Sequence, residues 1–283
     1  MIKGAFSKFS FKYDNWGANP SATPGTSVIP GASNAEGAWT QIASAANIAQ
    51  DTCLLWLRVS DGFTSAQIKN HLLDVGVDQA GGTAYTAVIN NIVCGGASGL
   101  SNGGGPEFLL PRHIKAGSSV AVRIQGSNGT AGTVRVGARF YGQPDHPENI
   151  PVGQYSETIG TITNSQGVTF TPGNAADGTW VSLGTTTRAL WWWQIGHQVS
   201  ASTVTAERTY IEIAYGDATN KHIIMRRMHV GNTTEDVGAI LDENMVPWAC
   251  YHPVPAGAEI WIRGRCQNAP DTGYNGVAIG IGG

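Results

Sequence analysis

The sequence is poor in charged residues and in long apolar runs, and each shortage excludes a class of protein. Only 13% of the 283 residues are charged, about half the roughly 25% of an ordinary globular protein. The formal net charge is −3, so the chain lacks the broad positive field that nucleic-acid binding uses, and we expect no nucleic acid as a partner. No stretch approaches the roughly 18 apolar residues of a membrane span. The first 16 residues interleave lysines with aromatics and do not form a secretory signal, so we expect synthesis in the cytoplasm.

Cysteine is scarce too, and no CxxC pair or zinc-like spacing occurs among Cys53, Cys94, Cys250 and Cys266. We expect reduced, partly buried thiols. A bridge between Cys250 and Cys266 stays open as an alternative, because such a separation can span a hairpin. The seven histidines are scattered and form no HExxH-like pair. We therefore expect no metal site and no cofactor.

Glycine, by contrast, is abundant, with 38 residues in 283. Thr, Ser, Val and Ile recur between the glycines, and this composition favours strands and turns over helices. The length exceeds the roughly 100 to 200 residues of one typical domain, so two units are expected.

An internal repeat defines the organisation of the chain. Residues 25–42 read GTSVIPGASNAEGAWTQI and residues 167–183 read GVTFTPGNAADGTWVSL, so both carry Pro-Gly, an Asn-Ala step, an acid-Gly pair and then tryptophan. A second match pairs HIKAGSSVAVRI at 113–124 with PVPAGAEIWIR at 253–263. The offsets are 141 between the tryptophans (180 − 39) and 140 between the arginines (263 − 123). A repeat of this length predicts two copies of one structural unit.

The shared residues have a structural interpretation. Trp39 and Trp180 each follow a glycine turn and open a strand, where a large ring can close the end of a sandwich. Arg123 and Arg263 lie at positions that alternation points outward, toward solvent or a local carboxylate. A weaker third match sets LLDVGVD at 72–78 beside IEIAYGD at 211–217.

Period-two alternation predicts half-buried strands, most clearly at 119–125, 133–140 and 259–265. Seven or eight strands in each half predict an all-β fold, a tandem pair of related β-sandwich domains of jelly-roll type, preceded by an N-terminal arm. The predicted boundaries are an arm at 1–24, a first domain at 25–142, a linker at 143–160 and a second domain at 161–283.

The arm carries five aromatic rings, which are too many for a solvated tail: Phe6, Phe9, Phe11, Tyr13 and Trp16. We expect them to dock either on the first domain of their own chain or on a neighbouring subunit. Both alternatives stay open.

The candidate ligand site is the second half's run of tryptophans. In a strand, the side chains of Trp191 and Trp193 share one face, and an exposed face of this kind suits the apolar side of a sugar. The alternative is that both faces of the strand are buried. We predict a shallow aromatic and polar glycan site formed by Trp191, Trp193, Arg263 and Asp217.

Paired carboxylates give an alternative chemistry, because glycoside hydrolysis needs two acids across a cleft. Asp74 with Asp78, and Asp217 with Glu212, are the candidate pairs. The low acid content and the absence of convergent reactive groups favour a protein that is not an enzyme, and we predict no catalytic residue.

The segments GTSVIPGASNAEGAWTQI, LLDVGV and IKAGSSVAVR resemble small virion proteins of tailed bacteriophages and of phage-like gene transfer agents. The resemblance covers both halves and implies a β-rich spike or fibre component, assembled in the host cytoplasm and exposed on the particle. It carries no catalytic or binding residue across.

The resemblance and the residues together predict a virion-surface structural protein, a spike, fibre tip or decoration module that adheres to host polysaccharide. The expected partners are other particle proteins, contacted through the arm, and further copies of this chain in a homo-oligomer. The alternatives are a carbohydrate-active hydrolase and a purely architectural capsid cement protein.

Overall fold

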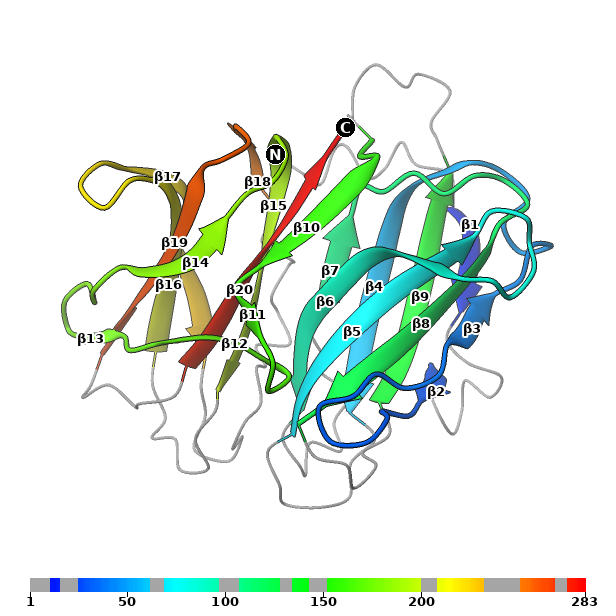
Figure 1. Ribbon diagram of the computed structural model, residues 1–283, viewed down its shortest axis with the longest axis horizontal. Helices are drawn as coiled ribbons and strands as arrows, with labels where there is room; N and C mark the ends of the chain where they lie inside the picture. The colour runs from blue at the N-terminus through cyan, green and yellow to red at the C-terminus, as the bar shows by residue number, and fades with distance from the viewer. Residues whose placement is uncertain are drawn as a thin grey trace.

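The computed structural model of the protein describes residues 11–15, 25–61, 69–96, 107–127, 134–142, 152–199, 208–231, 250–267 and 274–283. Every regular element in these ranges is a β-strand. The strands form two sandwiches that lie side by side, with the first half of the chain in one and the second half in the other (Figure 1). The predicted all-β tandem of sandwiches is confirmed.

The first sandwich has a five-stranded and a four-stranded sheet. The five-stranded sheet has the order β1-β9-β4-β7, with β2 also on β9, and the four-stranded sheet has the order β3-β8-β5-β6. The strands are β1 (Phe11–Asn15), β2 (Thr26–Val28), β3 (Thr40–Ala43), β4 (Thr52–Asp61), β5 (Lys69–Asp78), β6 (Thr86–Gly96), β7 (Glu107–Leu110), β8 (Ser119–Gly126) and β9 (Val134–Gly142).

The second sandwich has a six-stranded and a five-stranded sheet. The six-stranded sheet has the order β11-β12-β20-β15-β18, with β10 also on β20, and the five-stranded sheet has the order β13-β19-β16-β17, with β14 also on β19. The strands are β10 (Tyr155–Ile159), β11 (Thr161–Ile162), β12 (Gln166–Phe170), β13 (Gly173–Asn174), β14 (Val181–Thr185), β15 (Leu190–Val199), β16 (Arg208–Gly216), β17 (Lys221–Gly231), β18 (Cys250–Val254), β19 (Glu259–Cys266) and β20 (Tyr274–Gly282).

The two halves share one topology. The order β3-β8-β5-β6 in the first half corresponds to β14-β19-β16-β17 in the second, and β1-β9-β4-β7 corresponds to β10-β20-β15-β18. Each equivalent pair of strands is antiparallel in both halves. The repeat seen in the sequence is therefore a repeat of the fold.

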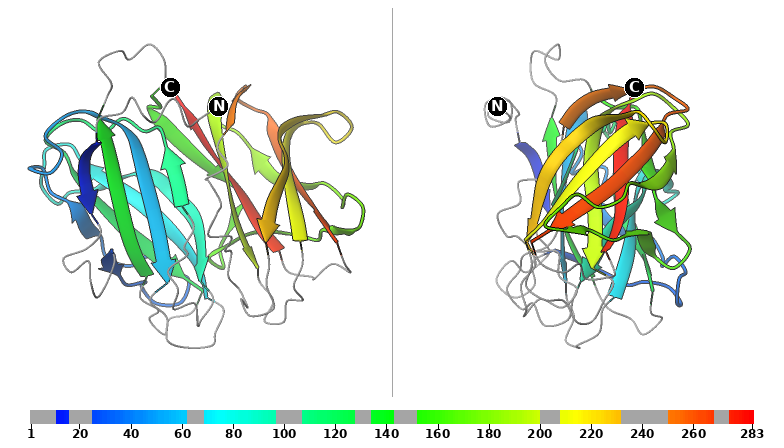
Figure 2. Two further views of the ribbon diagram at one scale, coloured as in Figure 1. Left: turned by 180° about the vertical axis from the view of Figure 1, so that it is seen from behind. Right: turned by 90° about the vertical axis from the view of Figure 1, so that its left-hand side faces the viewer.

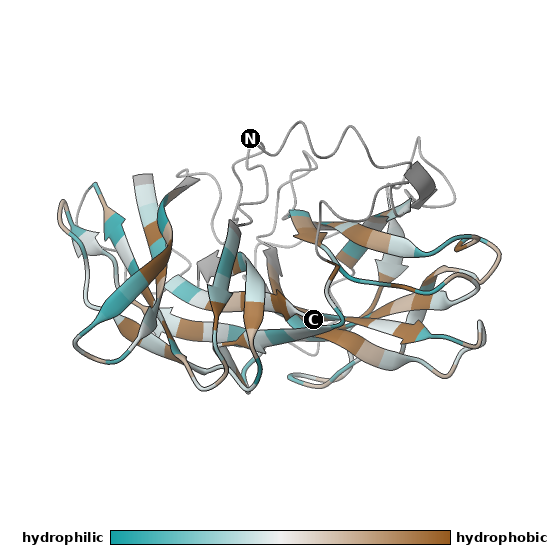
Figure 3. Cartoon of the chain, turned by 90° about the horizontal axis from the view of Figure 1, so that it is seen from above, coloured by the Kyte–Doolittle hydropathy of each residue, from teal (hydrophilic) through white to brown (hydrophobic). Residues whose placement is uncertain are grey.

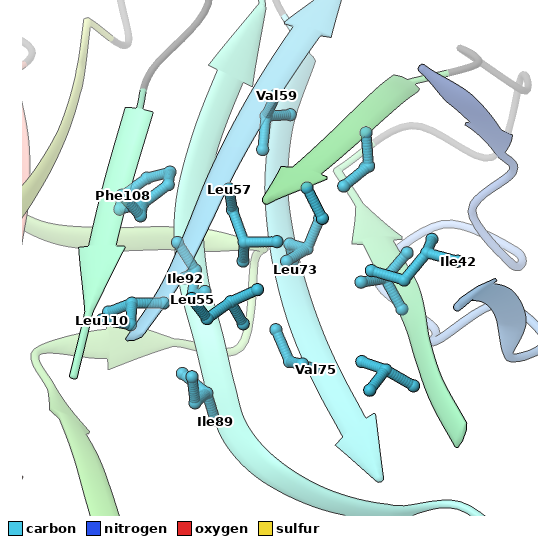
Figure 4. Close-up of a cluster of buried hydrophobic side chains, with 14 of the residues drawn as sticks. Ile42, Leu55, Leu57, Val59, Leu73, Val75, Ile89, Ile92, Phe108 and Leu110 are labelled. Atoms are coloured by element: carbon cyan, nitrogen blue, oxygen red, sulfur yellow. The ribbon is translucent and has the colours of Figure 1, made fainter. Parts of the chain in front are cut away.

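Alternation along the strands builds each core. In β19 the burial alternates residue by residue, with Ile260 and Ile262 inside and Trp261 and Arg263 on the outer face. Apolar bands separated by polar ones are visible along the strands when they are coloured by hydropathy (Figure 3). In the first half, side chains from both sheets meet between the layers (Figure 4): Ile42, Leu55, Leu57, Val59, Leu73, Val75, Ile89, Ile92, Phe108 and Leu110.

The sandwiches are joined through β20, which is buried on both faces. Val277, Ile279 and Ile281 belong to the apolar core of the first half, whereas Tyr274 and Ala278 belong to the core of the second half. Because one strand contributes to two cores, the halves form one packed body.

Polar contacts fix the same junction. The indole of Trp192 donates to the carbonyl of Leu109 at 3.1 Å, and the amide of Leu109 donates to Oε1 of Gln194 at 3.1 Å. Across β6, the hydroxyl of Ser156 donates to the carbonyl of Val88 at 2.8 Å. The edge strands of the first sandwich are therefore covered by the second.

The arm and the linker differ in part from the expected boundaries. β1 lies within the arm and pairs with β9, so the arm adds a strand to the first sandwich of its own chain. The aromatic rings of the arm lie outside the residues whose side chains are described. β10 lies inside the segment expected to be a linker, and it pairs with β20, so the second sandwich begins before residue 161.

The described thiols are buried and unbridged. Cys266 is in no disulfide, so the alternative bridge to Cys250 does not form, and its Sγ donates to the carbonyl of Gly173 at 3.4 Å. Burial raises the pKa of the Cys53 thiol to about 11, and burial likewise raises the pKa of Cys94. These are core side chains that stay protonated at neutral pH.

Candidate functional site

The outer face of the β13-β19-β16-β17 sheet lies at the end of the molecule away from the first sandwich (Figure 1, and toward the viewer in Figure 2, right). Strand alternation places four polar side chains on this face. Tyr210 of β16 is paired with Arg265 of β19, and Glu212 is paired with Arg263. Ile211, between the two, points into the core.

Arg263 is the centre of a tightly bonded cluster. Its Nε and Nη2 donate to Oε2 of Glu212 at 2.8 and 2.6 Å. The same Nη2 lies 2.8 Å from Oδ2 of Asp177, and the guanidinium stacks over the ring of Trp180 at 4.5 Å from its centroid. A guanidinium held by two carboxylates and an aromatic face is fixed in position.

A short loop before β14 brings Asp177 and Trp180 to the cluster. The amides of Ala175 and Gly178 donate to the carbonyls of Cys266 and Gly264, each at 2.8 Å. These bonds tie the loop to the end of β19. The acid-Gly pair of the sequence repeat is therefore the segment that delivers the second carboxylate.

A β-bulge in β17 faces Glu212. Ile211 pairs with Met228 and Ile213 pairs with Met225, so Glu212 alone lies opposite both Arg226 and Arg227. Arg227 has a φ of +49°, a conformation that non-glycine residues seldom adopt. Bulges of this kind redirect side chains and often lie beside functional sites. Here the bulge puts two arginines on the outer face.

The two bulge arginines remain largely open to solvent. Their side chains are 71% and 57% exposed, and their Nε atoms lie 3.8 and 4.0 Å from Oε1 of Glu212. Both distances exceed those of a hydrogen bond. Arg226 and Arg227 therefore contribute charge next to Glu212 without satisfying its second oxygen.

Glu212 has one oxygen without a hydrogen bond to any residue that the structure describes. The residue is only 4% exposed, and among the described residues Oε1 accepts no hydrogen bond while Oε2 is held by Arg263. An unsatisfied buried carboxylate oxygen is costly, and in native proteins it calls for a specific explanation. A ligand hydroxyl is one group that would satisfy it.

The cluster borders a shallow recess of about 10 Å³ that is open to solvent. Tyr210, at one side of the recess, is 36% exposed. A recess of this size has room for roughly one water-sized group, far less than the roughly 300 to 1,000 Å³ of pockets that enclose small molecules, so a larger ligand would lie over it and place one small group inside. It is lined by Asp177, Tyr210, Glu212, Arg227, Arg263, Gly264 and Arg265.

The first half contains the same central cluster. Arg123 of β8 bonds Oδ2 of Asp74 on β5 at 2.9 Å and Oε2 of Glu36 at 2.5 Å. Its guanidinium stacks over Trp39 at 4.4 Å from the ring centroid. We name the four-residue arrangement of arginine, two carboxylates and tryptophan the Arg–Trp frame.

The first copy of the frame is closed where the second is open. A bulge in β6 also lies opposite Asp74, since Leu73 pairs with Ile92 and Val75 pairs with Ile89. There, however, the backbone amide of Asn91 donates to Oδ1 of Asp74 at 2.7 Å. Both oxygens of Asp74 are therefore satisfied.

The second sandwich also covers the rim of the first copy. Gln125 donates through Nε2 to the hydroxyl of Ser165 at 3.0 Å, and Ser165 donates to Oδ1 of Asn34 at 2.8 Å. Ser165 is fully buried in this junction. The rim of the first frame thus lies at the contact between the halves, whereas the rim of the second borders an open recess.

The four residues predicted as a ligand site do not come together, and only Arg263 lines the recess. Trp193 is 1% exposed, and its indole donates to the carbonyl of His252 at 2.9 Å in the second core. It cannot stack on a ligand. The reason is that both faces of β15 are covered, as in the alternative that the sequence left open: Trp193 lies in the second core, and Trp192, on the opposite face, packs on the first sandwich.

Trp191 and Asp217 occupy other surfaces. Trp191 is half-buried and packs at 5.9 Å against the ring of Tyr251, which is 63% exposed. This pair lies at the β18 edge of the six-stranded sheet. Asp217 lies in the turn after β16 and accepts hydrogen bonds from the amides of Thr219 and Asn220, each at 2.7 Å. These bonds lower the pKa of Asp217, and its role is that of a turn cap.

Neither predicted pair of acids faces a common cleft. Asp78 accepts from the amides of Ala80 and Ala84 at 2.8 and 2.9 Å, so it stabilises a turn, while Asp74 belongs to the first frame. Asp217 follows Glu212 by five positions along an extended strand, roughly 16 Å at about 3.3 Å per residue. The acid that joins Glu212 is instead Asp177.

Sequence reasoning missed Asp177, Tyr210 and the two bulge arginines. The acid-Gly pair shared by the repeats was a signal for Asp177, because its position repeats beside a repeated tryptophan. Adjacent arginines in a strand that is otherwise apolar, IIMRRMHV at 223–230, were a signal for a bulge. Alternation alone would send one of the two inward.

Comparison with known proteins gives likenesses of fold only. No protein-family model matches the chain, and no curated protein matches it. Among solved structures, PNGF-II matches with a TM-score of 0.39 and 10% identity over 98% of this chain, and this chain spans 66% of that one, just under two thirds.

Two further solved structures are similar. PNGase F, a glycosylasparaginase from Flavobacterium meningosepticum, has a TM-score of 0.33 and 12% identity over 97% of this chain and 94% of its own. The CBM22 tandem domain of Xyn10C from Paenibacillus barcinonensis has a TM-score of 0.25 and 8% identity over 85% and 82%. One of these neighbours is named as a glycosylasparaginase and the other as a tandem CBM22 domain, and none of the structures named here is a virion protein.

The prediction that the chain is not an enzyme is contradicted by this comparison. Peptide-N-(N-acetyl-β-glucosaminyl)asparagine amidase, whose structure matches 91% of this chain and is itself covered to 96%, is an enzyme on a similar arrangement of strands. The sequence argument rested on the absence of convergent acids, and Glu212 and Asp177 do converge on Arg263. At 11% identity and a TM-score of 0.33, the likeness assigns no activity to this chain.

The described ranges contain no helix that is long and apolar enough to cross a membrane. No group of three or more His, Cys, Asp or Glu side chains that could hold a metal ion occurs in the same ranges.

Proposed function

We propose that the chain recognises glycans, that its ligand binds in the Glu212 recess, and that the protein does so as a surface component of a virion-like particle. The observation that carries the glycan proposal is the buried, unpartnered Oε1 of Glu212 beside an exposed ring and several guanidinium groups. A hydroxyl of a sugar can donate a hydrogen bond to Oε1 of Glu212, and other hydroxyls of that sugar can accept hydrogen bonds from arginine.

The form of the recess supports this ligand class. A sugar presents a polar edge of hydroxyls and a less polar face, and Tyr210 offers an aromatic side chain next to the charged groups. Hydrogen bonds to charged groups are stronger than bonds between neutral groups. A small number of fixed polar groups on a rigid sheet is therefore enough to orient a sugar residue over a shallow site.

The particle role rests on the sequence resemblance to virion spike and fibre proteins, and the division between the halves is compatible with it. The first half carries the arm strand β1, and the open recess lies on the second half, at the far end of the molecule (Figure 1). In this proposal the first half attaches to the particle and the second half meets host polysaccharide. Many copies on one particle would raise the overall avidity of weak single sites.

Affinity electrophoresis of the purified full chain through gels containing a panel of polysaccharides tests the glycan proposal. The panel comprises dextran, xylan, alginate, polygalacturonate, hyaluronate and heparin, with a gel lacking polysaccharide as the reference. We expect retardation in at least one gel, with loss of retardation in Glu212→Gln. Asp217→Asn is the control, because it removes an acid from the same sheet outside the recess.

Retardation that survives Glu212→Gln, or no retardation on any member of the panel, would overturn the glycan proposal at this site. The same samples are assayed for reducing ends and for released oligosaccharides. Steady release that Glu212→Gln and Asp177→Asn abolish would establish the alternative, a hydrolase that uses these two carboxylates. Immunogold labelling of intact particles tests the particle role, which fails if the antibody labels no particle.

A further inference from the structure

The two copies of the Arg–Trp frame differ most in the residues around them. The bulge that faces the acid carries Asn90 and Asn91 in the first half and Arg226 and Arg227 in the second. All four lie at equivalent places, since the flanking pairs Leu73 with Ile92 and Ile211 with Met228 match in register. Two neutral side chains in one copy are thus two cations in the other.

A third position changes in the same direction. Gln125 pairs with Leu72 on the rim of the first frame, and Arg265 pairs with Tyr210 on the rim of the second. The open copy therefore has three more guanidinium groups and one more exposed ring than the closed copy. The whole chain has a formal net charge of −3, so this cluster of cations is local.

The added cations are not needed to balance the frame. Arg263 already bonds both Glu212 and Asp177 at hydrogen-bond distance, as Arg123 does for the two acids of the first copy. The first copy is complete with one arginine. Arg226 and Arg227 make only long ion pairs with Oε1 of Glu212, at 3.8 and 4.0 Å, so with Arg265 they can also attract an anion in the recess.

We infer that the recess takes an acidic glycan, whose carboxylate or sulfate group is bound by Arg227 and Arg265 while a neighbouring hydroxyl donates to Oε1 of Glu212. This inference rests on the proposed function and specifies its substrate class. Arginine is suited to the task, because its planar fork matches the two oxygens of a carboxylate or sulfate. Arg226, at the edge of the recess, adds long-range attraction.

The acids of the recess select against other polyanions. Asp177 and Glu212 lie among the arginines, so a ligand with closely spaced charges along its backbone would meet repulsion next to attraction. A glycan with one anionic group on a sugar that also carries hydroxyls matches both signs. Such a glycan carries a single charge next to hydroxyl donors, whereas a nucleic acid backbone carries closely spaced phosphate charges.

The test compares each acidic polysaccharide with a neutralised partner of the same backbone. Polygalacturonate, alginate and hyaluronate are paired with their carboxyl-reduced forms, and heparin is paired with its desulfated, carboxyl-reduced form. Dissociation constants of the full chain are measured by affinity electrophoresis at low salt and at 0.3 M salt. We expect binding of at least one acidic member to weaken about tenfold or more on neutralisation, the effect of losing a charge-assisted contact, and to weaken with salt.

The double variant Arg226→Asn with Arg227→Asn transplants the bulge residues of the first half into the second. It should fold, because Asn91 adopts a φ of +55° at the equivalent place where Arg227 has +49°. We expect it, and Arg265→Gln, to lose about tenfold or more in affinity for the acidic member. Lys115→Gln with Arg188→Gln is the control, since it removes the same charge from exposed positions outside the recess.

The outcomes separate the inference from the proposed function. Equal binding of the acidic and neutralised forms, or undiminished binding by the double variant with its fold intact by circular dichroism, overturns the inference and leaves glycan recognition standing. Equal losses in the double variant and in the control overturn it as well, because the effect would then be one of net charge. Absence of binding to every member, neutral ones included, overturns the proposed function itself.

Discussion

The first and second halves of this chain hold the same Arg–Trp frame and use it differently. In the first half the amide of Asn91 completes the hydrogen bonds of Asp74, and Ser165 of the other sandwich covers Gln125 at the rim. In the second half Oε1 of Glu212 accepts no hydrogen bond from the described residues and faces a recess. One copy is a closed structural element, and the other has the features of a binding site.

The difference shows how little must change to open such a cluster. Glutamate is longer than aspartate by one methylene group, so the carboxylate at position 212 does not occupy the place in which Asp74 accepts an amide proton. The fixed guanidinium, its second acid and its tryptophan are retained in both copies. The two copies share the frame and differ in the residues at its edge.

The largest expected effect tests the cores of the two halves. Trp193 in the second core corresponds to Leu55 in the first. Trp193 pairs across the strands with Gly280, and Leu55 pairs with Phe140, so in each half a larger residue lies beside a smaller one. Trp193→Ala should lower the free energy of unfolding by about 3 to 5 kcal/mol, because it leaves a large cavity. Trp191→Ala should cost less than about 1 kcal/mol. Urea denaturation measures both, and equal losses would mean that Trp193 is not a core residue.

Next in size is the loss of the central arginine from either frame. Arg123→Met and Arg263→Met should each lower the free energy of unfolding by about 2 to 3 kcal/mol, because two carboxylates remain without their cation. This loss is smaller than the roughly 3 to 5 kcal/mol for breaking a fully buried ion pair, because both arginines are about one fifth exposed. The same denaturation series measures them. A loss in one half and none in the other would show that the two frames are not equivalent in stability.

Replacing the central acid should separate the copies. Asp74→Asn should lower the free energy of unfolding by about 1 to 3 kcal/mol. Both oxygens of Asp74 accept hydrogen bonds, so the NH₂ group of the new side chain must face either the amide of Asn91 or the guanidinium of Arg123, which are themselves donors. Glu212→Gln should cost less than about 1 kcal/mol, because its NH₂ can take the place of the unpartnered Oε1. Chemical denaturation at pH 7 compares the two variants. The reverse order of losses would contradict the assignment of the open copy.

The smallest effect concerns pH. Backbone amides lower the pKa of two carboxyl groups by donating hydrogen bonds to them. The amide of Ala116 donates to Asp51, and the amides of Asn220 and Thr219 donate to Asp217. A lowered folded pKa gives stability that is present above the unfolded value near 3.9 and is lost as pH falls through the folded value. Asp51→Asn and Asp217→Asn should each slightly flatten the fall of the urea midpoint below about pH 4. An unchanged acid limb in both variants would exclude this contribution.

Much of the fold could be predicted from the sequence, because a repeat is a long-range signal. The matched Trp39 and Trp180, and the matched Arg123 and Arg263, fixed the correspondence of the halves before any strand was placed. Alternation then identified β8 and β19. The pairing of Arg263 with a carboxylate also follows from its outward position, as expected.

The site itself depended on features that alternation does not carry. Trp193 was expected on a surface, but its ring lies in the second core while Trp192 on the other face packs on the first sandwich, a long-range contact that alternation cannot predict. The bulge that places Arg226 and Arg227 on one face is a break in periodicity. The recess forms where Asp177 arrives from a distant loop, and sequence spacing gives no measure of that approach. Irregular register and long-range loop contacts are thus what the sequence left undetermined.

The most direct test of the account is a crystal structure of the full chain soaked with an acidic oligosaccharide from the member of the panel that binds best. We expect a sugar residue in the Glu212 recess, with a hydroxyl within about 3 Å of Oε1 and an anionic group at Arg227 or Arg265, and no sugar at Asp74. A sugar bound at the first frame, or only at Trp191 and Tyr251, would contradict the division of roles between the two halves.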